Sequence, residues 1–184
     1  ILFSGWTGVA HSAPLPAWMP ALSTVGTVFM LIPVMAVALN ITRTVGGKWS
    51  SLAANPPPRF MAVGTLAFVF AWLVRIVCAG VDGKYPVSLT WLTAAQAHLN
   101  TYGFFCLVMF GAAYAILPWL TQSEFPSPRL VRAHFWMALV GVLLTVLPLA
   151  VAGIVEARRM LDPNIPFMSV LKSTLIFLRV STMG

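Results

Sequence analysis

The chain has 184 residues, of which 59% are hydrophobic and 8% are charged, and its mean hydropathy is +0.89. Soluble domains carry about 25% charged residues, so this chain has too few to cover a surface that faces water, which excludes an ordinary soluble enzyme or a disordered tail. Its net charge of +7 reflects eleven scattered Lys and Arg and only four acids, a pattern that excludes a nucleic-acid-binding domain. The composition predicts an all-α polytopic membrane protein.

Charged residues divide the chain into about five predicted transmembrane helices, which form a single domain over 1–184. The predicted spans are 21–41, 60–79, 91–120, 133–155 and 166–183. A Pro-rich entry loop precedes the first span, and Pro33 predicts a kink within it. The NPPPR segment is expected to stop any helix before the second span. The fifth span is the weakest, because it carries Lys172 and Arg179. Since the chain opens in apolar sequence without Met, we expect it to be a fragment of a longer polypeptide.

Loop charges predict the orientation of these spans. The loop between the first and second spans contains Arg43, Lys48 and Arg59, and the loop between the third and fourth contains Arg129 and Arg132. Because Lys and Arg are enriched in cytoplasmic loops, both of these loops are expected to face the cytoplasm.

Ionisable side chains inside a span are costly, so each is a candidate for function. The candidates are His11, Arg75, His98 and His134. Arg75 could extend to the interface, form a structural pair, or neutralise a buried anion such as a propionate. His134 starts the fourth span next to Arg132, so an interfacial position is expected for it.

His98 lies in the most polar patch within the predicted spans, together with Gln96, Asn100, Thr101 and Tyr102. Imidazole is a strong iron ligand, so His98 could bind a haem. It could equally be a hydrogen-bonded histidine at a helix contact. Two residues on a helix of 3.6 residues per turn differ by about 200°, so Gln96 and His98 are expected on opposite sides of one helix.

The segment LTAAQAHLNTYGFF and the MFGAAYAILPWLT that follows it resemble helix X of subunit I of the haem-copper oxidases, especially the cbb-type oxidases and nitric oxide reductases. Other segments resemble neighbouring helices of the same subunit, namely WTGVAH, APLPAW and LIPVMAVALNI before it and RLVRAHFWMALVGVLLTVLPLAVAGIVEA after it. The resemblance implies that the five spans are the last five helices of a subunit I bundle.

A His-x-His pair is found in helix X of that family, where the first His binds the high-spin haem and the second binds the low-spin haem. The matching positions here are Gln96 and His98, so the resemblance implies a low-spin b-type haem on His98 without the high-spin ligand. Tyr102 is one turn further on and could pack on or hydrogen-bond to such a haem, or serve in packing alone. The second axial His would come from missing N-terminal helices or from another polypeptide.

The family also uses a His-His pair for its second metal, which is copper or non-haem iron. Ala10 and His11 match that pair, so only His11 remains as a potential ligand, and the oxidase tyrosine expected just upstream is missing. The resemblance therefore implies a degenerate site for reduction of oxygen or nitric oxide, and leaves open a second haem or metal.

The leading hypothesis is a respiratory electron-transfer subunit that holds a low-spin haem. If active, it would be an oxidoreductase of the cytochrome c oxidase or nitric oxide reductase type. The alternatives are a non-catalytic structural subunit of a larger respiratory complex and a haem-free transporter. Expected partners are membrane lipid and other subunits, including a c-type cytochrome, with no nucleic acid. The expected location is the bacterial inner membrane.

Overall fold

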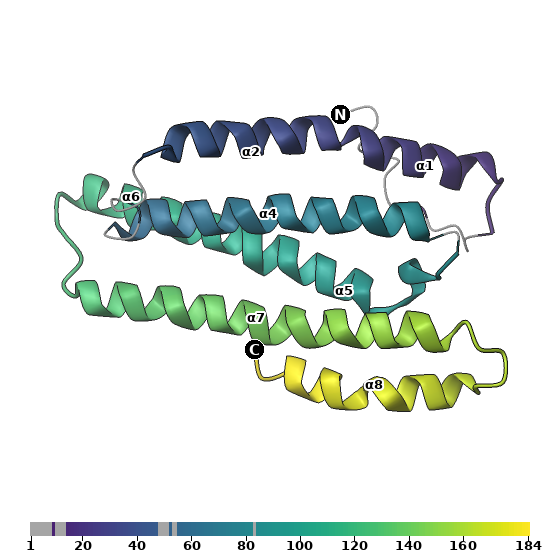
Figure 1. The fold of residues 1–184 in the computed structure, drawn as a ribbon. Coiled ribbons are helices and arrows are strands. Elements are labelled where there is room, and N and C mark those ends of the chain that lie inside the picture. The colour runs from purple at the N-terminus through teal and green to yellow at the C-terminus, as the bar shows by residue number, and fades with distance from the viewer. Residues whose placement is uncertain (1–8, 10–13, 48–51, 53–54, 83) are drawn as a thin grey trace.

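The structure is a computed structural model of the chain and describes residues 9, 14–47, 52, 55–82 and 84–184. The described part is a bundle of helices without strands (Figure 1). Its elements are α1 (Trp18–Phe29), α2 (Leu31–Val45), α4 (Pro56–Val81), the short 3₁₀-helix η2 (Val87–Leu89), α5 (Trp91–His98), the π-helix η3 (Leu99–Cys106), α6 (Leu107–Thr121), α7 (Pro128–Arg159) and α8 (Phe167–Ser181).

Four helical stretches among the described residues are long and apolar enough to cross a membrane. They are Trp18–Val45, Pro56–Val81, Trp91–Thr121 and Pro128–Arg159. The fifth predicted span is α8, whose 15 residues extend about 22 Å at 1.5 Å per residue, less than the roughly 30 Å of a bilayer core. The prediction of an all-α polytopic membrane protein is confirmed.

Prolines shape the starts and bends of these helices. The first span bends at Met30, between α1 and α2, because Pro33 has no N–H to donate to the carbonyl of Phe29 and its ring crowds that carbonyl. The second helix begins at Pro56, four residues earlier than predicted. The prolines after Asn55 form its first turn, where a missing N–H costs nothing, instead of lying outside the helix.

The helices run back and forth (Figure 1). Arg43, Arg59, Arg129 and Arg132, which the sequence placed in loops, lie in the last turns of α2 and the first turns of α4 and α7, and these helix ends share one end of the bundle. The chain passes from α2 to α4 and from α6 to α7 at this end. In the interior, α4 packs against α6 and η3, α5 packs against α7, and α7 packs against α8. Phe60, Leu107 and Phe135 form one buried cluster, and Ala95, Val146 and Leu149 form a second beside α5.

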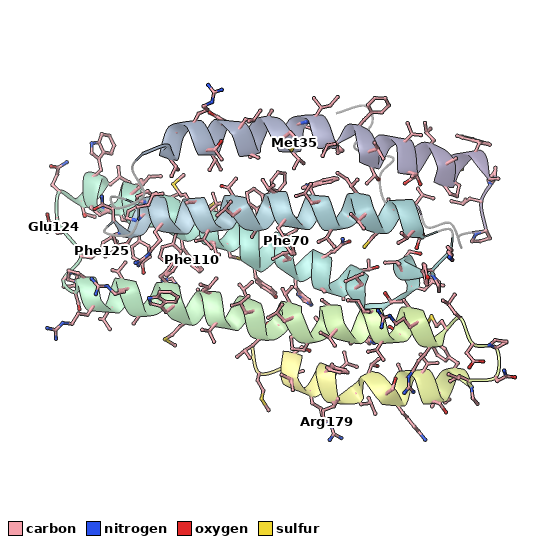
Figure 2. All side chains as sticks on the ribbon, in the orientation of Figure 1. Met35, Phe70, Phe110, Glu124, Phe125 and Arg179 are labelled. Carbon is pink, nitrogen blue, oxygen red and sulfur yellow. The ribbon has the colours of Figure 1, made fainter. Side chains whose placement is uncertain are left out.

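Large apolar side chains cover the outside of the bundle. Phe70 and Met35, which Figure 2 labels, are exposed, and so are Ile32, Val77 and Met137. Such a surface would be unstable in water and is stable against lipid chains. The fold therefore buries few large residues and presents most of them to the membrane.

Candidate functional site

Gln96 and His98 lie on opposite flanks of α5, as their spacing predicts. The helix starts at Trp91, and the Thr90 hydroxyl before it caps the N–H of Leu92. It is a regular α-helix through His98, so the two side chains diverge and line two separate cavities. The flanks of this one helix therefore have different chemistry.

The cavity on the His98 flank is large and mostly apolar, with a volume of about 810 Å³. It lies between α5, η3, α6, α7 and α8 and is lined by Trp91, Leu149 and Leu178, among others. Small residues at Ala94, Ala138 and Gly141 leave the space open. Cavities of roughly 300–1,000 Å³ with apolar walls are typical of cofactor sites.

His98 presents a free imidazole to this cavity. It makes no hydrogen bond with any residue in the described part of the chain. The alternative prediction, a histidine that is hydrogen-bonded at a helix contact, therefore has no support among these residues. The ring stacks on Tyr102, with centroids 5.4 Å apart and planes 7° apart. The stacking restricts rotation of the imidazole and leaves its nitrogens available.

A π-helix starts directly after His98 and continues to Cys106. Runs of π-helix are rare and often occur at functional sites, because the wider turn shifts side chains relative to a regular helix. His98, Tyr102 and Cys106 are spaced four residues apart, and all three line the large cavity. Since residues four apart share a face of a helix, one continuous face of α5 and η3 forms this part of the cavity wall.

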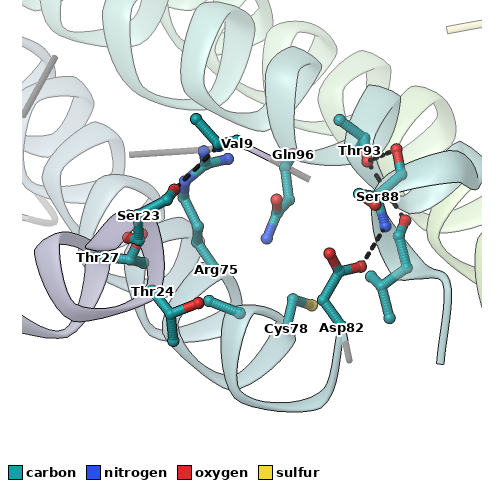
Figure 3. Close-up of a pocket in the computed structure, with 12 residues that line it drawn as sticks. Val9, Ser23, Thr24, Thr27, Arg75, Cys78, Asp82, Ser88, Thr93 and Gln96 are labelled. Atoms are coloured by element: carbon teal, nitrogen blue, oxygen red, sulfur yellow. Dashed lines mark hydrogen bonds between the residues drawn. The ribbon is translucent and has the colours of Figure 1, made fainter. Parts of the chain in front are cut away.

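The cavity on the Gln96 flank is small and polar, with a volume of about 140 Å³ (Figure 3). Its lining comes from Val9, α1, α4 with the Asp82 that follows it, the segment before α5, and α5 itself. Arg75 lies here, on the opposite side of α5 from His98. The structure therefore brings His98 and Tyr102 together, and it separates Arg75 from both.

The two cavities differ in their fit to a haem. The His98 cavity offers an imidazole, mostly apolar walls and sufficient volume, which suits an iron porphyrin. The Gln96 cavity offers a carboxamide and charged groups, and its volume is a sixth of that of the His98 cavity, so it does not fit a porphyrin. Among the described residues there is also no group of three or more His, Cys, Asp and Glu side chains that could hold a metal ion.

Glu156 positions α5, although the fourth predicted span, 133–155, ends just before it. That expectation was wrong, because α7 continues to Arg159 and the Glu156 side chain is only 4% exposed. Its Oε2 accepts a hydrogen bond from the backbone N–H of Trp91 at 3.0 Å, which satisfies a free donor at the start of α5. The small residues Ala152 and Gly153 on the same face let the two helices approach closely.

Replacing Glu156 with Ala should destabilise the bundle by about 1–3 kcal/mol, because the N–H of Trp91 loses its acceptor in a buried place. Glu156→Gln should retain most of the stability, since the amide oxygen still accepts. Glu124→Ala is the matched control, because Glu124 is exposed in the loop after α6 (Figure 2). The measurement is the free energy of unfolding in detergent micelles. Equal losses for Glu156→Ala and Glu124→Ala would contradict the assigned role.

His134 belongs to an aromatic cluster that the sequence did not indicate. Its Nδ1 lies 2.8 Å from the Tyr114 hydroxyl, and its ring centroid lies 4.6 Å from that of Phe110 and 5.5 Å from that of Phe60. Which side chains of α6 and α7 meet depends on how the two helices pack, so the contact between Tyr114 and His134 could not be predicted from the sequence. His134 thus has protein partners and does not itself line either cavity, although its neighbour Phe110 lines the large one.

Ala10 and His11, the expected remnant of the second metal site, lie outside the described residues. A ligand role for His11 therefore stays a prediction.

The comparisons with known proteins agree with this architecture. The family model for cytochrome c and quinol oxidase polypeptide I matches residues 1–184. A cytochrome c oxidase subunit 1 homolog of Azorhizobium caulinodans is 27% identical over 157 residues, which cover 82% of this chain and 28% of that protein. The cbb3-type cytochrome c oxidase subunit CcoN1 of Stutzerimonas stutzeri is 26% identical over 154 residues, or 82% of this chain and 32% of that one.

A third relative, cytochrome c oxidase polypeptide 1 of Halobacterium salinarum, is 30% identical over 118 residues, which cover 58% of this chain and 19% of that protein. The chain thus spans less than a third of the length of each of these relatives. Since the family model covers every residue, the chain belongs to the cytochrome c and quinol oxidase polypeptide I family.

Proposed function

We propose that this chain is the C-terminal part of a respiratory electron-transfer subunit in which His98 provides one axial ligand to a low-spin b-type haem. The observation that carries the proposal is the His98 imidazole, which has no hydrogen-bond partner among the described residues and faces an apolar cavity of about 810 Å³. The other axial histidine would come from helices outside this chain or from another polypeptide.

A bound haem supplies a one-electron carrier. The residues of this chain would ligate it, orient it and exclude water from it. His98 provides the nitrogen ligand, and the Tyr102 ring stacked on it limits the orientation of the imidazole. The apolar lining keeps the surroundings poorly hydrated, and this burial is one of the factors that set the reduction potential of such a group.

The proposal assigns no reduction of oxygen or nitric oxide to this chain. In the haem-copper oxidases that the sequence resembles, a histidine stands where Gln96 stands here, and the cavity beside Gln96 does not fit a porphyrin. We therefore propose that electrons pass through the subunit within a larger complex in the bacterial inner membrane, with a c-type cytochrome as one partner. The replacement of ligands at the site for reduction of oxygen or nitric oxide also favours a second candidate function, that of a structural subunit of such a complex.

The test is a reduced-minus-oxidised spectrum of the purified assembly, together with its turnover of oxygen and nitric oxide. We expect a low-spin b-type band, and we expect a physiological reductant to reduce this haem at least as fast as the assembly turns over. A haem that stays oxidised would favour the structural subunit, and a spectrum without any b-type band would contradict the proposal.

Replacing Gln96 with Ala should leave the low-spin haem in place, because Gln96 faces the opposite flank of α5. The amplitude and position of the b-type band should match those of the unmodified protein. The measurement is the same difference spectrum at equal protein concentration. Loss of that band in Gln96→Ala would show that the haem lies on the Gln96 side.

A further inference from the structure

The small cavity beside Gln96 contains buried polar atoms that no described residue satisfies. The Nε2 atom of Gln96 and the Oγ atom of Ser88 are both buried and both lack a hydrogen-bond partner in the described structure. Gln96 is only 9% exposed, and its amide points into the space between Arg75 and Asp82 (Figure 3). Because buried donors are almost always paired, two of them in one cavity point to an occupant that accepts hydrogen bonds.

Arg75 adds a positive charge to the same lining. The Arg75 residue is half-buried, and it has no carboxylate within ion-pair distance in the part of the chain that is described. A charge within a membrane span is normally paired, and the guanidinium fork matches carboxylate-like oxyanions. The arginine and the Gln96 amide therefore form a donor pair for an anion, and the Ser88 hydroxyl lies across the cavity beside Asp82 (Figure 3).

Asp82 limits the charge that such an anion can carry. Its carboxylate lines the cavity, with Oδ1 accepting a hydrogen bond from the N–H of Ser88 at 2.8 Å. One carboxylate beside one guanidinium disfavours a divalent anion such as sulfate or hydrogen phosphate. A monovalent anion bound on the Arg75 side is the best match.

The volume limits the size of the ligand. A cavity of about 140 Å³ is similar to the roughly 150 Å³ engineered cavity that holds benzene, so it admits only a small molecule. We propose that this cavity binds a small monovalent oxyanion of the formate or nitrite class, held by Arg75 and Gln96. The same donors could instead hold the carboxylate arm of a larger cofactor, and the experiment separates the two sources.

The test is calorimetric titration of formate into the complete protein in lipid nanodiscs. We expect saturable binding to the unmodified protein. Arg75→Gln and Gln96→Leu should each weaken it at least about tenfold, because each removes hydrogen bonds to a charged ligand. Arg179→Gln is the matched control, since Arg179 is exposed on α8 (Figure 2), and it should bind as the unmodified protein does. Asp82→Asn should bind formate more tightly, because the repulsion is removed.

The same titration with His98→Ala separates this site from the proposed haem. Formate should bind that variant as well as the unmodified protein, since His98 lines the other cavity. Failure of the haem proposal therefore leaves this result intact. Binding that appears only in the haem-depleted variant would mean that a cofactor carboxylate occupies the cavity. The proposal would be overturned by that outcome or by the absence of saturable binding. It would also be overturned if Arg75→Gln bound formate as well as the unmodified protein, or if Asp82→Asn bound it more weakly.

Discussion

Replacing His98 with Ala is expected to eliminate the low-spin b-type band from the difference spectrum of the purified assembly. The imidazole is the only histidine side chain among the described residues that lines the large cavity, so its loss removes the iron ligand contributed by this chain. Neighbouring apolar residues cannot replace it, because iron in a low-spin site needs a strong axial donor. The band should fall to background, whereas the amount of folded protein should stay near that of the unmodified chain.

Two variants make this result specific. His134→Ala should keep the full band, because His134 hydrogen-bonds to Tyr114 and is not among the residues that line the cavity. His98→Met should retain some haem with a higher reduction potential, since a thioether is a weaker donor that stabilises the reduced iron. An unchanged spectrum for His98→Ala would refute the assignment of the ligand.

Replacing Gly153 with Leu should cause the largest loss of stability. A Cβ atom at this position would overlap the backbone nitrogen of Leu92, and it would lie 2.8 Å from the Cα atom of Leu92. Because a backbone cannot move aside as a flexible side chain can, α5 and α7 would have to separate. We expect overpacking to lower the free energy of unfolding by about 1–3 kcal/mol. We expect a further loss because the hydrogen bond from the Trp91 N–H to Glu156 breaks.

Gly80→Leu is the matched control for this prediction. Gly80 also lies in a membrane helix, but a Cβ atom there would meet nothing within 4 Å. The free energy of unfolding and the haem content should both fall in Gly153→Leu and stay nearly constant in Gly80→Leu. Comparable stability of the two variants would mean that the contact between α5 and α7 contributes little.

Charge-free stretches predicted the membrane helices well because lipid strongly penalises charge, yet charge alone misplaced some helix ends. The fourth span was predicted to end before Glu156, and the structure continues it because the carboxylate has a partner across the interface. The spacing of Ala152, Gly153, Glu156 and Ala157 on one helical face is a signal that could have identified this contact. The prolines from Pro56 onward were similarly placed outside a helix that they begin.

At the site, the opposite directions of Gln96 and His98 could be predicted because they follow from the helical repeat alone. The separation of Arg75 from His98 could not, because it depends on which face of α5 meets α4. The π-helix and the size of each cavity depend on the packing of several helices, and no local pattern indicated either. The partner of His134 was missed for the same reason.

An electron cryomicroscopy map of the intact assembly tests the haem assignment most directly, because it shows both flanks of α5 at once. We predict porphyrin density in the large cavity, with its iron bonded to the His98 ring, and no porphyrin against Gln96. A map in which the His98 ring contacts only protein or lipid, or in which the porphyrin lies beside Gln96, would contradict the account.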